Sequence, residues 1–322
     1  MEAFVAPLAV LLEGWLGYSQ RLVAAIGHPV IWYGKLIDFL ETRLNRLDRA
    51  DTERRQAGLV TLAVLLGVTL AATLLILQVT ARIPQGWIIE ALLATPFLAQ
   101  KELGRAVKAV AEALGAGLPE ARAAVGEIVG RDTAELDESG ISRAAIETLA
   151  ESTSDGVIAP LFWLIILGLP GIALYKAINT ADSMIGHRTE RYRDFGWASA
   201  KLDDLVNWVP ARLSSVLITA ACFCVRGTSP SSAWGAAIRD ARNHDSPNAG
   251  WPEAAMAGAL GIVLGGARFY EGVEVDLPAM GDGRRTLTRN DIRRALHIYG
   301  VTLTLTLVVT VVIAALRFLG GF

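Results

Sequence analysis

The chain has few of the residues from which disulfide frameworks and thiolate or imidazole metal sites are built. Among its 322 residues are two cysteines and four histidines. Cys222 and Cys224 lie two positions apart in an apolar segment, and on a helix such residues point about 200° away from each other. They therefore cannot bridge one another. The histidines lack the spacing of metal ligands, so we expect neither a disulfide nor a metal site built on these two residue types.

The sequence also lacks the common motifs of nucleotide and nucleic-acid binding. It has no G-x-G-x-x-G, and its nearest approach to a Walker loop has too many residues between Gly27 and Gly34. Leu36 stands where that loop needs Ser or Thr for magnesium. A net charge of −2, without a long basic tract, indicates no nucleic-acid partner. No basic region precedes the first apolar stretch, which Glu13 ends early, so a cleaved signal peptide is not expected.

Hydrophobic residues, by contrast, make up 52% of the chain, against 19% charged residues. This balance predicts an all-α, polytopic integral membrane protein rather than a soluble globule. Residues 57–79 carry no charge and would reach roughly 34 Å as a helix, enough to cross a hydrocarbon core of about 30 Å. Residues 301–316 are also uncharged, and Tyr299 and Arg317 can anchor the two ends of this second span.

The distribution of positive charge predicts which loops share a side of the membrane. Arginine and lysine recur in residues 42–56 and 101–154, and basic residues prefer the cytoplasmic side. The simplest topology is a hairpin, with residues 57–79 running out and residues 87–98 running back. We predict one membrane-embedded domain over residues 1–322, in which the 101–154 segment is a cytoplasmic insertion of amphipathic helices.

The apolar segment 157–175 is expected to be broken or re-entrant, which would return the chain to the same face. The reason is its content of helix-breaking residues, Pro160, Gly168, Pro170 and Gly171. Irregular backbone at membrane depth persists only where it is buried in protein or lines a cavity.

Residues 176–212, which follow that segment, bring acids, bases, amides and aromatic rings together. If the first part is helical, Lys176, Asn179 and Ser183 share a face, with Asp182 at its edge. This mixture suits a site for a bulky, charged ligand. The alternative is a polar connection between membrane segments.

The second part of this stretch carries an acidic pair, Asp203 and Asp204, and Asp203 lies one helical turn before Asn207. Two carboxylates of this kind can hold hydrated magnesium together with substrate phosphates. The competing interpretation is a solvated amphipathic helix. Between the two parts, three arginines can clamp phosphate, although interfacial anchoring would use the same residues: Arg188, Arg191 and Arg193.

A further candidate loop covers about residues 240–253. The stretch SPNAGWPEAAMAGAL from Ser246 combines turn residues with a helix start at Pro252 and Glu253. Gly250 would let backbone approach a ligand closely. A turn of this composition can equally be structural.

These blocks together resemble a known family. The stretch NTADSMIGHRTERYRDFGWASAKLDDLVNWVPAR from Asn179 closely resembles the signature of the cobalamin-biosynthesis membrane proteins called CobD or CbiB, the adenosylcobinamide-phosphate synthases. Other blocks agree in order: HPVIWYGKLI from His28, GRDTAELDESGISRAAIETLAE from Gly130, SDGVIAPLFW from Ser154 and SPNAGWPEAAMAGALG from Ser246. The resemblance runs from about residue 25 to 300. Ser152 is a departure, because the family pattern leads us to expect Asn there.

The resemblance implies an ATP-dependent ligase that uses Mg²⁺. It would join a carboxylate of adenosylcobyric acid to the amine of aminopropanol phosphate or a close analogue. Phosphorylation makes the carboxylate a better acyl donor, and the negative charge must be offset by Arg, Lys and Mg²⁺. The implied setting is the inner cell membrane, in several passes, with the active site facing the cytoplasm. Homo-oligomerisation is left open.

Roles follow for individual residues. The base that takes the proton from the amine is sought at Glu151 or Asp155, with Asp182 as a third catalytic candidate. Asp203 and Asp204 are the metal candidates. The corrinoid could pack on Trp197, Trp208 or Trp251, for which membrane anchoring is the alternative. The expected substrate and phosphate contacts are Lys176, Asn179, Ser183, Arg188, Arg191, Arg193, Lys201, Asn207, Arg212, Ser246, Asn248, Trp251 and Glu253.

Two other functions compete with the ligase. A non-catalytic relative on the same scaffold could serve signalling or assembly, but the rich loop chemistry weighs against it. A transporter would also use broken segments. Uncharged spans weigh against a transporter, because translocation sites place ionisable groups within the bilayer, and Glu90 is the main exception.

Overall fold

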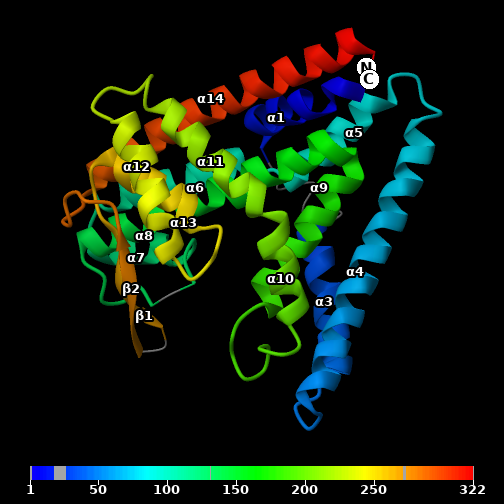
Figure 1. The fold of residues 1–322 in the computed structure, drawn as a ribbon, viewed down its shortest axis with the longest axis horizontal. Coiled ribbons are helices and arrows are strands. Elements are labelled where there is room, and N and C mark those ends of the chain that lie inside the picture. The colour runs from blue at the N-terminus through cyan, green and yellow to red at the C-terminus, as the bar shows by residue number, and fades with distance from the viewer. Residues whose placement is uncertain (1, 18–26, 131, 271–272, 322) are drawn as a thin grey trace. The chain divides into compact units, whose positions relative to one another are not determined.

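The computed structural model describes residues 2–17, 27–130, 132–270 and 273–321. The chain forms two compact units (Figure 1). Unit 1 comprises Met1–Ala99, Ala159–Asn207 and Val309–Phe322, and unit 2 comprises Gln100–Ile158 and Trp208–Val308. The all-α character predicted from the sequence is confirmed, apart from one hairpin. The 101–154 segment lies in unit 2, where it packs with residues that follow Trp208.

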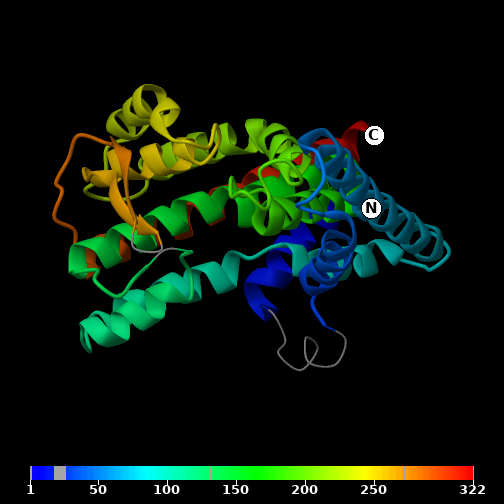
Figure 2. The ribbon, with the colours of Figure 1, turned by 90° about the horizontal axis from the view of Figure 1, so that it is seen from below.

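Unit 1 is built from helices that are far apart in sequence. In chain order they are η1 (Glu2–Phe4), α1 (Val5–Leu16), α3 (Pro29–Leu44), α4 (Asp51–Thr80), α5 (Gly86–Ala94), η2 (Thr95–Phe97), α9 (Ala159–Ile185), α10 (Trp197–Val206) and the end of α14 (Arg289–Gly320). Helices α3 and α4 lie side by side in both views (Figures 1 and 2), and both contact α9. Their shared core includes Ile37, Leu65, Ala177 and Phe195, which are buried.

Unit 2 has a larger apolar core. Its elements are α6 (Gln100–Ala113), α7 (Leu118–Gly126), α8 (Glu138–Thr153), η3 (Ser154–Ile158), α11 (Trp208–Ala221), α12 (Pro230–Asp240), η4 (Ala241–Asn243), α13 (Gly250–Leu260), β1 (Leu264–Tyr270), β2 (Val273–Met280) and the first part of α14. Leu103, Val107 and Val110 recur at helix spacing along α6, and all three side chains are buried in this core. Tyr299 fixes α14 to the start of α6 by donating to the Gln100 carbonyl at 2.7 Å.

The hairpin β1–β2 was not expected from the sequence, where residues 254–267 form one apolar segment. Helix α13 ends at Leu260 because Gly261 adopts the left-handed conformation, φ 64° and ψ 44°. The chain then continues as β1, which pairs antiparallel with β2. Gly265 and Gly266, both at positive φ, accompany an irregularity in the register between Leu264 and Gly266. Apolar composition alone did not reveal this change from helix to strand.

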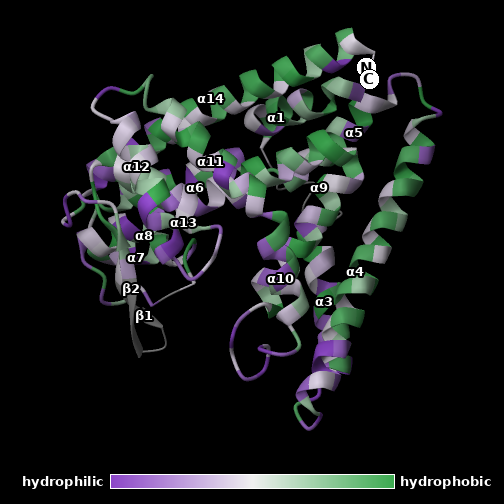
Figure 3. Cartoon of the chain, viewed as in Figure 1, coloured by the Kyte–Doolittle hydropathy of each residue, from purple (hydrophilic) through white to green (hydrophobic). Residues whose placement is uncertain are grey.

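Within the described residues, three helical stretches are long and apolar enough to cross a membrane: Asp51–Thr80, Glu138–Ile185 and Arg289–Gly320. The two uncharged spans predicted from the sequence, residues 57–79 and 301–316, fall within the first and the third of these stretches. Figure 3 shows hydrophobic residues along α4 and hydrophilic residues at its N-terminal end. Leu59, Val68 and Leu75 of α4 are exposed, as expected of side chains that face lipid.

The prediction that residues 87–98 run back across the membrane is wrong, because the helix there is too short. Residues 87–98 form α5 and the short η2, and nine helical residues reach only about 14 Å. This is too short to cross a bilayer core of about 30 Å. The break predicted in residues 157–175 is present, because Gly168 is non-helical (φ 64°, ψ −153°) and Pro170 follows within α9. Re-entry of this segment stays a prediction.

The charged end of unit 1 consists of the α3–α4 turn and the 186–196 loop. Arg54 is 5% exposed, and its Nη2 donates to the carbonyls of Arg191 at 2.6 Å and Glu190 at 3.1 Å. Arg55 pairs with Asp194 at 3.0 Å. Two of the basic loops expected on one side of the membrane are therefore in direct contact. Which side they face stays a prediction.

The close approach of α4 to this loop depends on Gly58. A Cβ on Gly58 would meet the Phe195 carbonyl oxygen well inside contact distance, whereas a Cβ on Gly67 of the same helix would meet nothing within 4 Å. We expect Gly58→Ala to lower the stability of the detergent-solubilised protein by about 1–3 kcal/mol. Gly67→Ala should be neutral or stabilising by up to about 1 kcal/mol. Thermal unfolding measures both, and equal melting temperatures for the two variants would contradict the contact.

Candidate functional site

The C-terminal end of α9 carries the first group of predicted site residues. The helix continues through Ile185, so Lys176, Asn179 and Ser183 share a face as predicted. Lys176 Nζ donates to Asn179 Oδ1 at 3.1 Å, and Ser183 Oγ donates to the Asn179 carbonyl at 2.8 Å. Asp182 is half-buried on the same stretch. Its negative charge is close enough to Asp203 to raise the pKa of that carboxyl.

Asp203 of α10 belongs to a hydrogen-bonded chain of polar side chains in unit 1. Asn207, at the C-terminal cap of α10, donates from Nδ2 to Asp203 Oδ2 at 2.9 Å. Tyr175 of α9 donates in turn to Asn207 Oδ1 at 2.9 Å. Tyr175 and Asn207 are each 1% exposed. The predicted one-turn relation between Asp203 and Asn207 is confirmed, but the Asn207 amide is occupied by Asp203 and Tyr175, so it positions the carboxylate.

The environment of Asp203 disfavours an uncompensated negative charge. Burial, followed by the nearby charge of Asp182, raises the pKa of Asp203 from 3.8 to about 7, although hydrogen bonds from Asn207 and Asn179 oppose the shift. The other oxygen, Oδ1, is buried and has no hydrogen-bond partner. An oxygen in this state needs either a proton or a cation.

These residues fit a magnesium ion held jointly with phosphate. Mg²⁺ takes one or two carboxylates and keeps water or substrate phosphates in its other positions. Among the described residues, no group of three or more His, Cys, Asp or Glu is arranged to hold a metal by itself. Asp204 forms an ion pair with Lys201, its Oδ2 lying 3.4 Å from Lys201 Nζ, whereas the buried Oδ1 of Asp203 has no hydrogen-bond partner. Asp203 is therefore the better metal candidate of the predicted pair.

The three predicted phosphate-binding arginines have different surroundings. Arg191 makes two hydrogen bonds to Glu41, from Nε at 2.9 Å and from Nη2 at 2.8 Å. Burial alone would raise the pKa of Glu41, but the hydrogen bonds from Arg191 and Asn45 outweigh it and the pKa is lowered. Arg193 lies 3.4 Å from Asp194. Arg188 is exposed and has no partner among the described residues, so it is the arginine most available to an incoming phosphate.

A second set of predicted residues belongs to unit 2. Glu151 is exposed near the end of α8, and Asp155 is half-buried in the π-helical turn η3. Single π-helical turns inside α-helices are frequent at functional sites. Here the turn coincides with the SDGVI part of the block used for the family resemblance, and the buried Ser154 Oγ has no partner. Ser152, the departure from the pattern, is half-buried beside it.

Arg212 of α11 lies between two indole rings in unit 2. Its guanidinium carbon is 4.3 Å from the Trp208 ring centroid and 4.8 Å from that of Trp251. Nη1 donates to the Trp208 carbonyl at 2.6 Å and to Asn248 Oδ1 at 3.2 Å. Arginine stacks on aromatic faces in this way because its guanidinium group is planar and weakly hydrated. Arg212 thus places one positive charge beside two aromatic rings.

The 246–253 turn is held by its own side chains. Ser246 Oγ accepts from the backbone N–H of Asn248 at 3.3 Å and of Ala249 at 3.2 Å. Glu253 is 1% exposed, and its Oε1 lies 3.5 Å from His244 Nε2. A Cβ on Gly250 would meet the Ala241 carbonyl, so this glycine serves close packing of the backbone. Glu253 and His244 thus fix the turn that presents Asn248 and Trp251.

The predicted residues fall into two sets, one in each unit. Lys176, Asn179, Asp182 and Ser183 gather on α9, and Asp203 is the centre of the α10 residues. Sequence reasoning missed Glu41, Arg54 and Tyr175, which position the first set. Glu41 and Arg191 are 150 residues apart, and no local pattern signals such a pair. His244, which contacts Glu253, was also missed, because the spacing of the histidines indicates no site.

Comparison with known proteins agrees with the resemblance seen in the sequence. The family model described as CobD/Cbib protein matches residues 6–299. A relative named "Cobalamin biosynthesis protein CobD" from Sinorhizobium sp is 47% identical over 299 residues, which cover 92% of this chain and 93% of the relative. Relatives with the same name from Rhodobacter capsulatus and Brucella anthropi are 46% identical over 310 residues (94% and 95% covered) and 43% identical over 309 residues (95% and 94% covered).

No solved structure matches the chain. The family model covers most of the chain, and the similarity to the relatives extends over nearly the whole length of each. On this ground the chain belongs to the CobD/CbiB family of cobalamin biosynthesis proteins.

Proposed function

We propose that the protein is an ATP-dependent ligase that joins a carboxylate of adenosylcobyric acid to the amine of aminopropanol phosphate or a close analogue. Family membership supplies the pathway and therefore a corrinoid substrate. The observation that carries the reaction type is Asp203, whose buried oxygen without a partner and raised pKa suit a cation held jointly with phosphate. A ligase that consumes ATP needs such a group.

The reaction has two steps. The carboxylate first attacks the γ-phosphorus of ATP, giving an acyl phosphate and ADP. The neutral amine then attacks the acyl carbon, phosphate leaves, and the nitrogen loses a proton to a base. When bound, Mg²⁺ would neutralise phosphate charge. Asp203 would hold it, and Asn207 and Tyr175 would keep the Asp203 carboxylate in place.

The other residues have roles suited to their surroundings. Arg188 would bind a phosphate, because it is exposed and has no partner in the described part of the chain. Glu151 and Asp155 are the candidates for the base, one exposed and one half-buried at the π-helical turn. Trp208, Arg212 and Trp251 would contact the corrinoid, whose flat ring carries polar substituents.

The proposed location is the inner membrane, in several passes, with the charged end of unit 1 in the cytoplasm. The three candidate membrane spans found in the described part of the chain support the membrane part of this proposal. Glu90 is the ionisable residue that favoured a transporter. Its Oε1 accepts a hydrogen bond of 2.6 Å from Oγ1 of Thr80, which lies at the end of α4. A carboxyl that contacts the end of a candidate membrane span does not mark a path through the bilayer centre, so the ligase is favoured.

The direct test is ligation by the purified full chain in lipid nanodiscs. Adenosylcobyric acid, Mg-ATP and aminopropanol phosphate should give adenosylcobinamide phosphate, with ADP released in equal amount. Mass spectrometry of the corrinoid measures the product. ATP-independent uptake of corrinoid into vesicles, without product, would instead support the transporter.

Asp203→Asn is expected to lower kcat by about 10²–10³, because it removes charge while preserving shape. It should also raise the magnesium concentration needed for half-maximal rate. Asp204→Asn, on the same helix but paired with Lys201, is the matched control and should change either quantity little. Rates measured against magnesium concentration test both. Equal losses in the two variants would contradict the assignment to Asp203.

Asp203 should also make stability depend on pH when no divalent cation is present. Its folded-state pKa is raised, so its neutral form favours folding, and that contribution is complete below 3.8 and is lost as pH rises to about 7. The melting temperature of the wild type minus that of Asp203→Asn should therefore fall over this range. Magnesium with a phosphate ligand should reduce the fall near pH 7. A difference that is independent of pH would contradict the raised pKa.

A further inference from the structure

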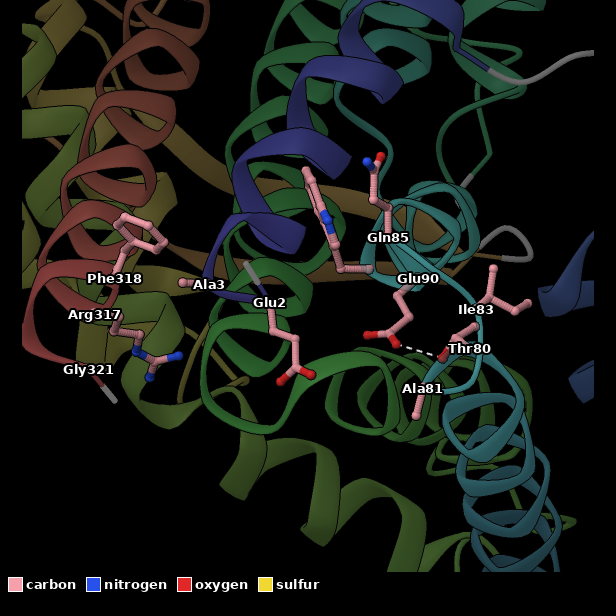
Figure 4. Close-up of a pocket in the computed structure, with 12 residues that line it drawn as sticks. Glu2, Ala3, Thr80, Ala81, Ile83, Gln85, Glu90, Arg317, Phe318 and Gly321 are labelled. Carbon is pink, nitrogen blue, oxygen red and sulfur yellow. Dashed lines mark hydrogen bonds between the residues drawn. The ribbon is translucent and has the colours of Figure 1, made fainter.

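At the end of α4 opposite to Arg54, unit 1 contains a cavity of about 500 Å³, here called the head cavity. Its lining includes charged residues of both signs, Glu2, Glu90 and Arg317, from the N-terminal turn, α5 and α14. In Figure 4 the side chain of Glu2 is seen between those of Arg317 and Glu90. Phe4 packs against Phe318 beside them, with ring centroids 5.7 Å apart.

Several polar groups of the head cavity can receive a ligand. Trp87 lines it, and its buried Nε1 has no hydrogen-bond partner. Arg317 donates from Nη1 to the Ile165 carbonyl at 2.6 Å, which leaves other N–H groups of the guanidinium for an anion. The lining therefore offers two carboxylates to a cation and donors from arginine and indole to an anion.

A second cavity of about 470 Å³, here called the tail cavity, adjoins the first. The two share Glu2, Ala3, Ala81, Glu90 and Arg317 in their linings. Away from these shared residues the tail cavity is mostly apolar, with side chains from α1, α4, α9 and α14 such as Val5, Leu77, Leu164, Leu169 and Ile313. A polar cavity with charges of both signs thus leads into an apolar one.

We propose that these two cavities bind one phospholipid whose head group is an aminoalkyl phosphate of the ethanolamine type. The ammonium group would lie between Glu2 and Glu90, the phosphate would meet Arg317 and Trp87, and an acyl chain would follow the tail cavity. This proposal rests on the proposed membrane location of the chain, but it does not rest on ligation.

The charge of the lining selects among lipids. Glu2 and Glu90 together outweigh Arg317 by one negative charge, which opposes an anionic head group that lacks an ammonium. A choline head group carries a cation but no N–H to donate to the carboxylates. A free aminoalkyl phosphate shares the chemistry of the head group but leaves the tail cavity empty. Neither lining includes Asp203, Asn207 or Tyr175.

The test is native mass spectrometry of the full chain with phosphatidylethanolamine, phosphatidylglycerol or phosphatidylcholine supplied in equal amounts. The wild type should retain phosphatidylethanolamine preferentially. Glu90→Gln should weaken this binding about tenfold, through the loss of a charge-assisted contact. Arg82→Gln is the control, because Arg82 is an exposed charged residue in the α4–α5 turn and is outside both linings. Equal retention of the three lipids would overturn the proposal.

A second pair of variants tests the acyl chain. Ala314→Phe would fill the tail cavity and should weaken lipid binding, whereas Val312→Phe, at an exposed position outside the lining, should not. Free phosphoethanolamine should fail to displace the lipid. If it displaces the lipid efficiently and Ala314→Phe has no effect, the site takes a small aminoalkyl phosphate and the lipid is excluded. Ligation measured on the same samples separates failure of this proposal from failure of the ligase.

Discussion

The polar contacts of Arg54 determine where the charged end of unit 1 is fixed. The 186–196 loop has little regular structure, so its carbonyls need donors from elsewhere. Arg54 supplies them from the first turn of α4, and Glu41 holds Arg191 of the same loop from α3. Helix α10 begins directly after this loop at Trp197. The position of Asp203 along α10 therefore depends on contacts made by residues that belong to no predicted site.

Burial has different consequences for the two carboxylates that organise unit 1. Glu41 is 5% exposed, yet two hydrogen bonds from Arg191 compensate its charge, and its pKa is lowered. Asp203 has the amides of Asn207 and Asn179 but no cationic partner in an ion pair within the described part of the chain, and its pKa is raised. A compensated buried charge fixes structure, whereas an uncompensated one attracts a proton or a cation. The same physical principle thus separates an anchoring residue from a candidate metal ligand.

Local sequence patterns predicted what depends on neighbours along the chain. The uncharged runs in α4 and α14, the break at Gly168 and Pro170, and the one-turn relation of Asp203 to Asn207 all follow from helix geometry and composition. Residues 87–98 were misjudged because apolar content does not reveal where a helix ends, and α5 ends at Ala94. Pairs such as Tyr175 with Asn207 and Glu41 with Arg191 were inaccessible, because they form only when distant segments pack.

The break in α9 leaves backbone carbonyls that need hydrogen-bond donors from outside the helix. Pro170 has no N–H to donate to the preceding turn, and Gly168 is non-helical, so backbone acceptors of that turn lose their usual partners. Arg317 donates to one of them, the Ile165 carbonyl. The guanidinium of Arg317 thus supplies a hydrogen-bond donor from α14 at the break in α9. If Arg317 turned away, the Ile165 carbonyl would need a water molecule in its place, and the break would become a hydrated point in the apolar first part of α9.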